Sequence, residues 1–172
     1  MKYAGIIKND TAAGEGVCVS FYTQGCHLHC DHCHNPQTWD FNGGKEFTQN
    51  TITEIIQAIK ANGVIRNFCI LGGEPLCAEN QFLTHLVLSE VRKKFPQIKI
   101  YIWTGYTYET LPQNERIEQI LSLTDYLIDG PYIHSLRDIT LPMRGSSNQR
   151  IIDLKSIKKY DIIKEKKENL NG

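Results

Sequence analysis

Two patterns of hydrophobic and polar positions alternate along the chain. Four short apolar runs, rich in β-branched or aromatic residues, predict strands at 17–23, 68–71, 99–103 and 126–128. Between them, hydrophobic residues recur at helical spacing in the segments 51–62, 80–95 and 115–123. The alternation of strands with helices predicts an α/β fold with a mostly parallel sheet and right-handed crossovers.

The ends of the elements add boundaries to this picture. Glu54 follows Thr51 by three residues, which predicts a capping box at the start of the first helix. Residues 151–154 predict a last edge strand. The lysine-rich segment 155–172 has little periodicity, so we expect one domain at 1–154 and a polar, frayed tail. A complete eight-stranded βα barrel needs about 250 residues, which predicts a partial, incomplete barrel here.

Composition narrows the possible partners. The chain is 41% hydrophobic and 22% charged, as in ordinary globular domains. Nineteen basic residues balance nineteen acidic ones, so no charge excess indicates a nucleic acid or an anionic membrane as partner. No leader pattern and no apolar run of membrane-spanning length are recognisable. We therefore expect a cytoplasmic protein.

The richest chemistry lies directly after the first predicted strand, where Cys26, Cys30 and Cys33 fall within eight positions. Thiolates select zinc, Cu(I) or iron–sulfur clusters. Zinc is one reading, because four histidines surround the thiols: His27, His29, His32 and His34. An iron–sulfur cube normally takes four thiolates, so three would leave one iron open to a small molecule. Cys18, Cys69 and Cys77 are predicted to be buried in the core.

A second motif, Gly72-Gly73-Glu74, ends the predicted strand 68–71. In a parallel sheet this end lies beside the segment 23–36 that contains the three cysteines, which we call the cysteine loop. Glycines permit a close approach of the backbone to a ligand, and exposed carbonyl groups at a strand end accept hydrogen bonds from an ammonium group. The carboxylate of Glu74 adds a negative charge that favours an amine.

Together, Cys-x3-Cys-x2-Cys and Gly-Gly-Glu resemble the radical S-adenosylmethionine (SAM) superfamily. The resemblance implies that Cys26, Cys30 and Cys33 hold a [4Fe-4S] cluster whose open iron is chelated by SAM. It also implies that Gly72, Gly73 and Glu74 hold the amine of SAM. His32 then faces the adenine, with Cys33 and His34 beside it. No side chain is expected to act as a catalytic acid or base, because the cluster and SAM carry the chemistry.

The two motifs identify a superfamily only, whereas three further stretches are typical of one family: Trp103-Thr104-Gly105-Tyr106, Asp129-Gly130 and Arg144-Gly145-Ser146-Ser147-Asn148-Gln149. With them, residues 14–154 resemble the activating proteins of anaerobic class III ribonucleotide reductases. That resemblance implies an oxidoreductase that cleaves SAM to methionine and a 5′-deoxyadenosyl radical, which takes a hydrogen atom from a glycine of the reductase. Flavodoxin or a similar protein would supply the electron. The missing barrel strands would leave a lateral opening for the glycine loop.

Two alternatives remain open from the sequence. One is a small radical SAM enzyme with a small-molecule substrate, similar to 7-carboxy-7-deazaguanine synthase. The stretch 144–149 argues against it. The other is a zinc-binding module without enzymatic activity.

Overall fold

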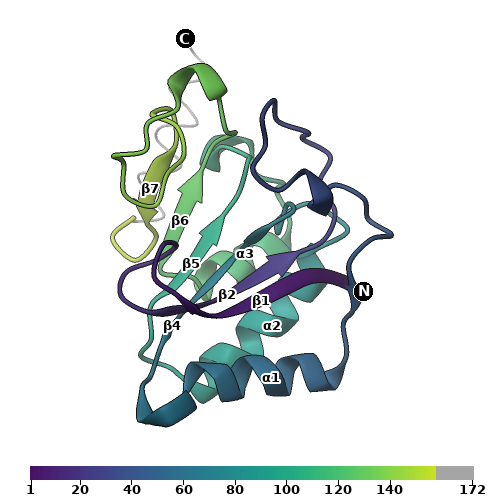
Figure 1. Ribbon diagram of the computed structural model, residues 1–172, viewed down its shortest axis with the longest axis vertical. Coiled ribbons are helices and arrows are strands. Elements are labelled where there is room, and N and C mark those ends of the chain that lie inside the picture. Colours follow the sequence, from purple (N-terminus) through teal and green to yellow (C-terminus); the bar gives the residue numbers. More distant parts are fainter. Residues whose placement is uncertain (158–172) are drawn as a thin grey trace.

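The computed structural model describes residues 1–157 (Figure 1). Seven strands form one sheet in the order β3-β1-β2-β4-β5-β6-β7. The four central strands are parallel: β2 (Cys18–Thr23), β4 (Asn67–Gly72), β5 (Ile100–Trp103) and β6 (Tyr126–Asp129). The outer strands run antiparallel to their neighbours: β1 (Lys2–Asp10), β3 (Lys45–Glu46) and β7 (Arg150–Asp153). The predicted mixed α/β class and the parallel centre are confirmed.

Three helices connect the parallel strands and gather on one side of the sheet (Figure 1): α1 (Gln49–Ile59), α2 (Gln81–Lys94) and α3 (Glu115–Ser122). Each matches a segment with helical spacing of hydrophobic residues. The predicted start of α1 is wrong, however. The cap is Thr48, which shares its capping box with Thr51, so Thr51 lies inside the first turn rather than before it.

Two strands have no counterpart in the predicted elements, namely β1 and β3. β1 lies next to the edge strand β3 and has three consecutive exposed residues. Hydrophobic and polar residues therefore do not strictly alternate along it. β3 has only two residues and pairs with the start of β1. Both are stabilised by pairing with neighbours, which their own side chains do not reveal.

The main core lies between the sheet and the helices. Its largest buried side chains include Phe21 and Phe68 from the strands and Ile55 from α1. A smaller cluster covers the opposite face of the sheet and contains Cys18, Cys69, Tyr101 and Ile128. These two cysteines and Cys77 are at most 1% exposed, which confirms their predicted burial.

The tail prediction falls mostly outside the described part of the chain, since 158–172 lie beyond it. The boundaries of the predicted domain, 1–154, stay a prediction. Among residues 1–157, no helix combines the length and the hydrophobicity needed to cross a membrane.

Candidate functional site

Loops at the carboxyl ends of the parallel strands surround a cavity of about 270 Å³, which we call the strand-end cavity. Its walls come from the cysteine loop, from the ends of β4, β5 and β6, and from the turn before β7. Ligand sites in parallel α/β sheets form at this edge. The cavity is lined by these residues: Cys26, Leu28, Cys30, Cys33, His34, Asn35, Leu71, Gly72, Gly73, Glu74, Trp103, Thr104, Gly105, Gly130, Tyr132, Gly145 and Gln149.

The cysteine loop brings all three predicted ligand thiols to this cavity. Its start is tied to the segment that follows the loop, because the Gly25 amide donates to the carbonyl of Thr38 at 2.7 Å. A turn inside the loop is closed by the Cys33 amide, which donates to the carbonyl of Cys30 at 3.1 Å. Partial burial raises the pKa of the Cys26 and Cys30 thiols. These two thiols therefore stay protonated near neutral pH and must lose a proton when a metal centre binds.

The donor set fits an iron–sulfur cluster. Three soft sulfur atoms line one cavity, and the structure shows no fourth cysteine in its wall among the residues described. Within 1–157, no three His, Cys, Asp or Glu side chains lie close enough together to share a single metal ion. In a cluster, by contrast, each thiolate binds a different iron atom.

Gly73 packs against the cysteine loop, as the topology predicts, whereas Gly72 packs against Tyr22 and Thr23 at the end of β2. A Cβ atom on Gly73 would lie 2.4 Å from the carbonyl oxygen of Gly25, too close for any side chain. The amide of Gly73 donates to the carbonyl of Thr23 at 2.9 Å, and that of Glu74 donates to Gly25 at 2.8 Å. The close backbone approach that requires glycine here is therefore made to the cysteine loop.

Glu74 is 2% exposed and joins the ends of two strands. Its carboxylate accepts hydrogen bonds from the Thr104 hydroxyl at 2.7 Å, the Gly105 amide at 2.7 Å and the Leu76 amide at 3.0 Å. Burial raises the pKa of Glu74 to about 7, and these three donors oppose the rise. Both carboxylate oxygens thus already have partners within the protein, so Glu74 fixes the β5 end relative to β4.

The predicted histidines are placed differently from one another. His34 lines the strand-end cavity and contacts the Tyr132 ring, with centroids 4.9 Å apart. His32 lies outside the lining and stacks on His134 at 4.0 Å. Together the two ring contacts join the cysteine loop to the segment that follows β6. His27 and His29 are exposed.

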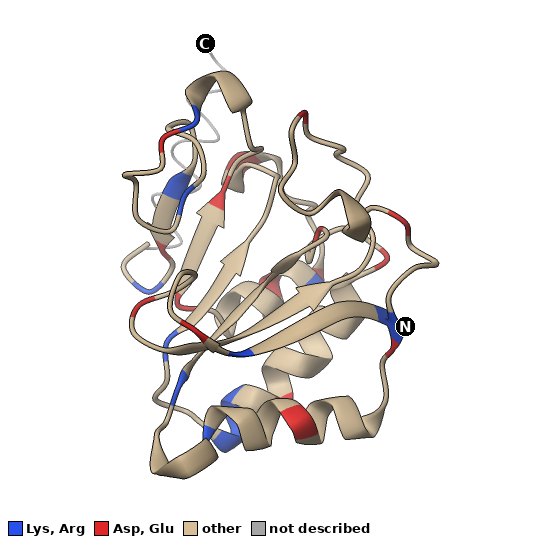
Figure 2. Cartoon of the chain, viewed as in Figure 1, with Lys and Arg blue, Asp and Glu red and all other residues tan. Residues whose placement is uncertain are grey.

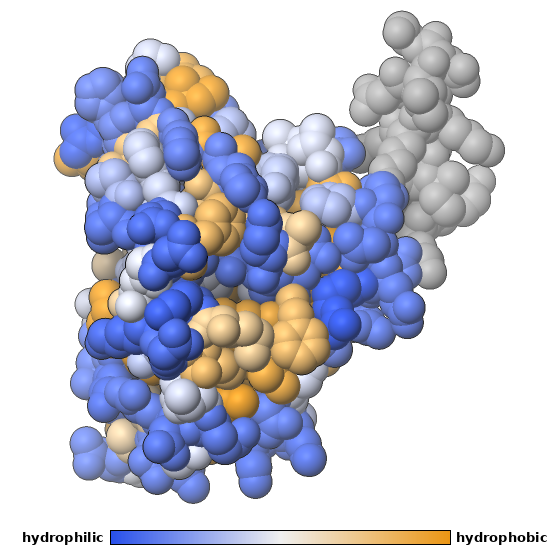
Figure 3. Space-filling model, turned by 90° about the vertical axis from the view of Figure 1, so that its right-hand side faces the viewer, coloured by the Kyte–Doolittle hydropathy of each residue, from blue (hydrophilic) through white to orange (hydrophobic). Residues whose placement is uncertain are grey.

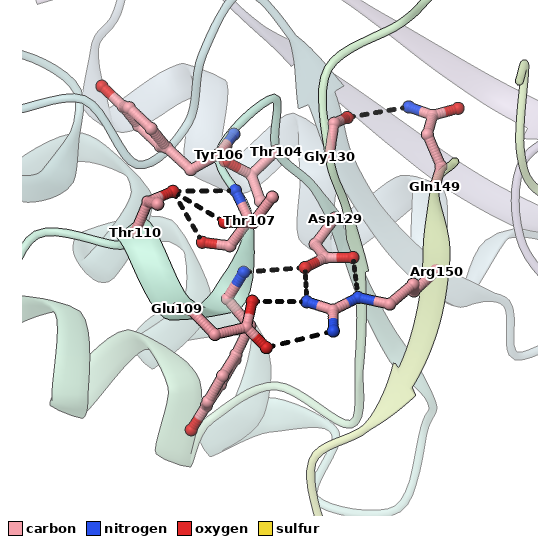
Figure 4. A network of polar contacts seen from close by, with 10 residues as sticks. Thr104, Tyr106, Thr107, Glu109, Thr110, Asp129, Gly130, Gln149 and Arg150 are labelled. Atoms are coloured by element: carbon pink, nitrogen blue, oxygen red, sulfur yellow. Dashed lines mark hydrogen bonds and ion pairs between the residues drawn. The ribbon is translucent and has the colours of Figure 1, made fainter. Parts of the chain in front are cut away.

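Several lining residues were not predicted as site residues from the sequence, among them Leu28, Tyr132 and Gln149. A Cβ atom on Gly105 would lie 2.2 Å from Cδ1 of Leu28, so Leu28 covers the β5 end. Gln149 holds the turn before β7, because its side chain donates to the carbonyl of Gly130 at 3.0 Å (Figure 4) and accepts from the Gly145 amide at 2.8 Å. The glutamine stands in the specific stretch 144–149, which is the only signal that marks it.

Next to Gln149, Arg150 closes the same edge with an ion-pair network. Its guanidinium donates to the carboxylates of both Asp129 and Glu109 (Figure 4). The Asp129 side chain is only 1% exposed and also accepts from the Tyr108 amide at 2.7 Å. The β6 end, the segment after β5 and the start of β7 are thereby fixed to each other.

Comparison with known proteins identifies related chains. A family model described as a 4Fe-4S single cluster domain matches residues 12–152. A protein of Enterobacteria phage T4 is 34% identical over 151 residues, which cover 88% of this chain and 93% of the relative. A protein of Pasteurella multocida is 32% identical and one of Escherichia coli K12 is 31% identical, over 88% and 90% of this chain and 96% and 100% of the relatives. All three relatives are named anaerobic ribonucleoside-triphosphate reductase-activating protein.

Proposed function

The chain belongs to the family of anaerobic ribonucleoside-triphosphate reductase-activating proteins, and on this premise we propose that it uses SAM to generate a glycyl radical on its reductase. The proposal rests above all on the strand-end cavity, which is lined both by the three thiols and by the motif Gly72-Gly73-Glu74. The resulting activity is that of an oxidoreductase that activates another enzyme.

Cys26, Cys30 and Cys33 would hold the iron–sulfur cluster to which the matched family model points. When bound, the cluster and SAM supply one-electron cleavage of the sulfonium bond and a radical able to take a hydrogen atom from a glycine. The chain itself fixes the cysteine loop, excludes water from the cavity and orients SAM.

The SAM contacts would come from Gly72, Gly73, Glu74, His32, Cys33 and His34. Some of these groups already have hydrogen-bond or ring partners within the protein. Because the Glu74 carboxylate is held by three protein donors, its charge stabilises an amine at a fixed position. His34 and Cys33 lie in the cavity wall, whereas His32 would reach the nucleoside only after leaving its stack on His134.

The reductase would be the protein substrate, with flavodoxin or a similar protein as electron donor in the cytoplasm. Lysine, arginine and acidic residues are interspersed along the chain (Figure 2), which supports a role without nucleic acid or membrane contacts. We also propose that the sheet is the partial barrel of radical SAM enzymes, open at the side where a glycine loop enters. Four parallel strands at its centre support this.

The two alternatives are not favoured. The names of the relatives all point to a reductase as substrate rather than a small molecule. A zinc module would need ligands that converge on one ion, an arrangement that residues 1–157 do not contain.

Anaerobic reconstitution tests the proposal. Wild-type protein should bind four iron atoms per chain as a cube and release methionine from SAM in the presence of dithionite. Cys30→Ala should lose both properties. The matched control is Cys69→Ala, which removes a buried cysteine outside the cavity wall and should retain both. Cleavage of SAM that survives in Cys30→Ala would overturn the assignment of the site.

A further inference from the structure

Exposed hydrophobic side chains concentrate in one segment next to the strand-end cavity. We call residues 131–141 the rim segment. Ile133 is 37% exposed, Leu136 40% and Ile139 81%, so three large aliphatic side chains face solvent within seven positions. Isolated exposed residues of this kind are ordinary, but a group in one place indicates a surface that another molecule covers.

The rim segment is held in place by the turn 144–149. The Ile133 amide donates to the Ser146 hydroxyl at 3.2 Å, and the Ser147 amide donates to the carbonyl of Leu136 at 2.9 Å. The Asn148 side chain donates to the carbonyl of Pro131 at 2.8 Å. The polar residues of this turn are therefore used to position the rim segment, which presents its aliphatic side chains on a fixed backbone.

The rim segment is continuous with the cavity wall. Tyr132 lines the cavity and contacts His34 of the cysteine loop, and Ile133 follows it directly. In Figure 1 the short helical turn at 134–136 lies at the same end of the molecule as the cysteine loop. A protein substrate whose glycine enters the cavity must cover the surface that borders it, and the rim segment is part of that surface.

Leu28, 37% exposed, also borders the cavity, but exposed hydrophobic residues such as Phe82 and Val64 do not. Figure 3 shows hydrophobic side chains both near the upper end of one face and in a patch at its centre. Phe82, at the start of α2, already carries the guanidinium of Arg116 over its ring at 5.4 Å. Val64 and Ile65 precede β4 and therefore lie at the opposite ends of the parallel strands from the cavity.

We propose that the rim segment, through Leu136 and Ile139 above all, is a docking surface for the reductase and binds an apolar surface beside its glycine-bearing loop. This inference rests on the proposed function and adds the residues that recognise the partner. It also gives the turn 144–149 an indirect role in binding the partner, because this turn holds the rim segment.

The test is the affinity for a purified class III reductase, measured anaerobically by biolayer interferometry with reconstituted full-length protein. Leu136→Ser/Ile139→Ser should raise the dissociation constant at least about tenfold, because buried aliphatic contacts at an interface are lost. Ile65→Ser, an equally apolar change at the opposite end of the sheet, should stay within about twofold of wild type. Melting temperatures establish that the variants are folded. Since Ile139 is 81% exposed, Ile139→Ser alone keeps the test valid if the double variant unfolds.

A double variant that binds the reductase with wild-type affinity would overturn the docking surface while leaving the proposed function intact. Wild-type protein that forms no glycyl radical on the reductase would overturn the proposed function, and this inference with it.

Discussion

Replacing Thr104 by valine removes one of three hydrogen bonds to the buried carboxylate of Glu74. The pKa of Glu74 rises on folding from about 4.5 to about 7, because burial disfavours its charged form. Each pH unit between folded and unfolded pKa corresponds to about 1.4 kcal/mol. Ionisation of Glu74 therefore lowers the free energy of unfolding by roughly 3 kcal/mol as the pH rises from about 4.5 to about 7.

The Thr104 hydroxyl stabilises the ionised form more than the neutral acid. A hydrogen bond to a charged group contributes about 2 kcal/mol and one to a neutral group about 1 kcal/mol. Thr104→Val should therefore lower the free energy of unfolding by about 1 kcal/mol more at pH 8 than at pH 5. It also removes the acceptor of the Tyr106 amide, but that loss is the same at both pH values.

Urea unfolding of the cluster-free protein at pH 5 and pH 8 measures this difference. The matched control is Thr84→Val, since the buried Thr84 hydroxyl donates to the neutral carbonyl of Pro75 at 2.8 Å and its loss should not depend on pH. Glu74→Gln should remove the part of the pH dependence that belongs to this carboxyl. An equal cost of Thr104→Val at the two pH values would refute the reasoning.

Two further changes test the packing around the strand-end cavity. Gly73→Ala places a Cβ atom against the Gly25 carbonyl, so it should lower the free energy of unfolding in urea by about 1–3 kcal/mol and reduce iron uptake. The control is Gly5→Ala, whose Cβ atom meets no atom within 4 Å and should leave both quantities nearly unchanged. Arg150→Ala leaves the buried Asp129 carboxylate without its cation and should lower the free energy of unfolding at pH 7 by about 2 kcal/mol; a change below about 0.5 kcal/mol would show that the Tyr108 amide alone satisfies Asp129.

The sequence predicts the centre of this molecule better than its edges. The strands β4 and β5 are found because burial on both faces requires short continuous apolar runs, and the helix α2 is found because burial on one face requires helical spacing of its hydrophobic residues. β1 is missed because its pairing with β2 and β3 supplies stability that its polar residues do not encode. The start of α1 is misplaced by three positions, since Thr48 and Thr51 are both competent caps.

The same holds for the site. Cysteine spacing alone finds Cys26, Cys30 and Cys33, because their chemistry is local to one loop. The prediction that Gly72-Gly73-Glu74 lies beside the cysteine loop follows from the parallel topology of the sheet. The partners of Glu74 do not follow, because Thr104 and Gly105 meet it across 30 residues of chain. The covering of the β5 end by Leu28 likewise depends on how two loops pack, which no local pattern records.

The proposed activity of this chain is to make a glycyl radical on an anaerobic ribonucleotide reductase. The most direct measurement is electron paramagnetic resonance of an anaerobic mixture of reconstituted protein, SAM, dithionite and a class III reductase. We expect a glycyl doublet that is absent with Cys30→Ala and present with Cys69→Ala. SAM cleavage by the wild-type protein without any doublet on the reductase would contradict the proposed activity.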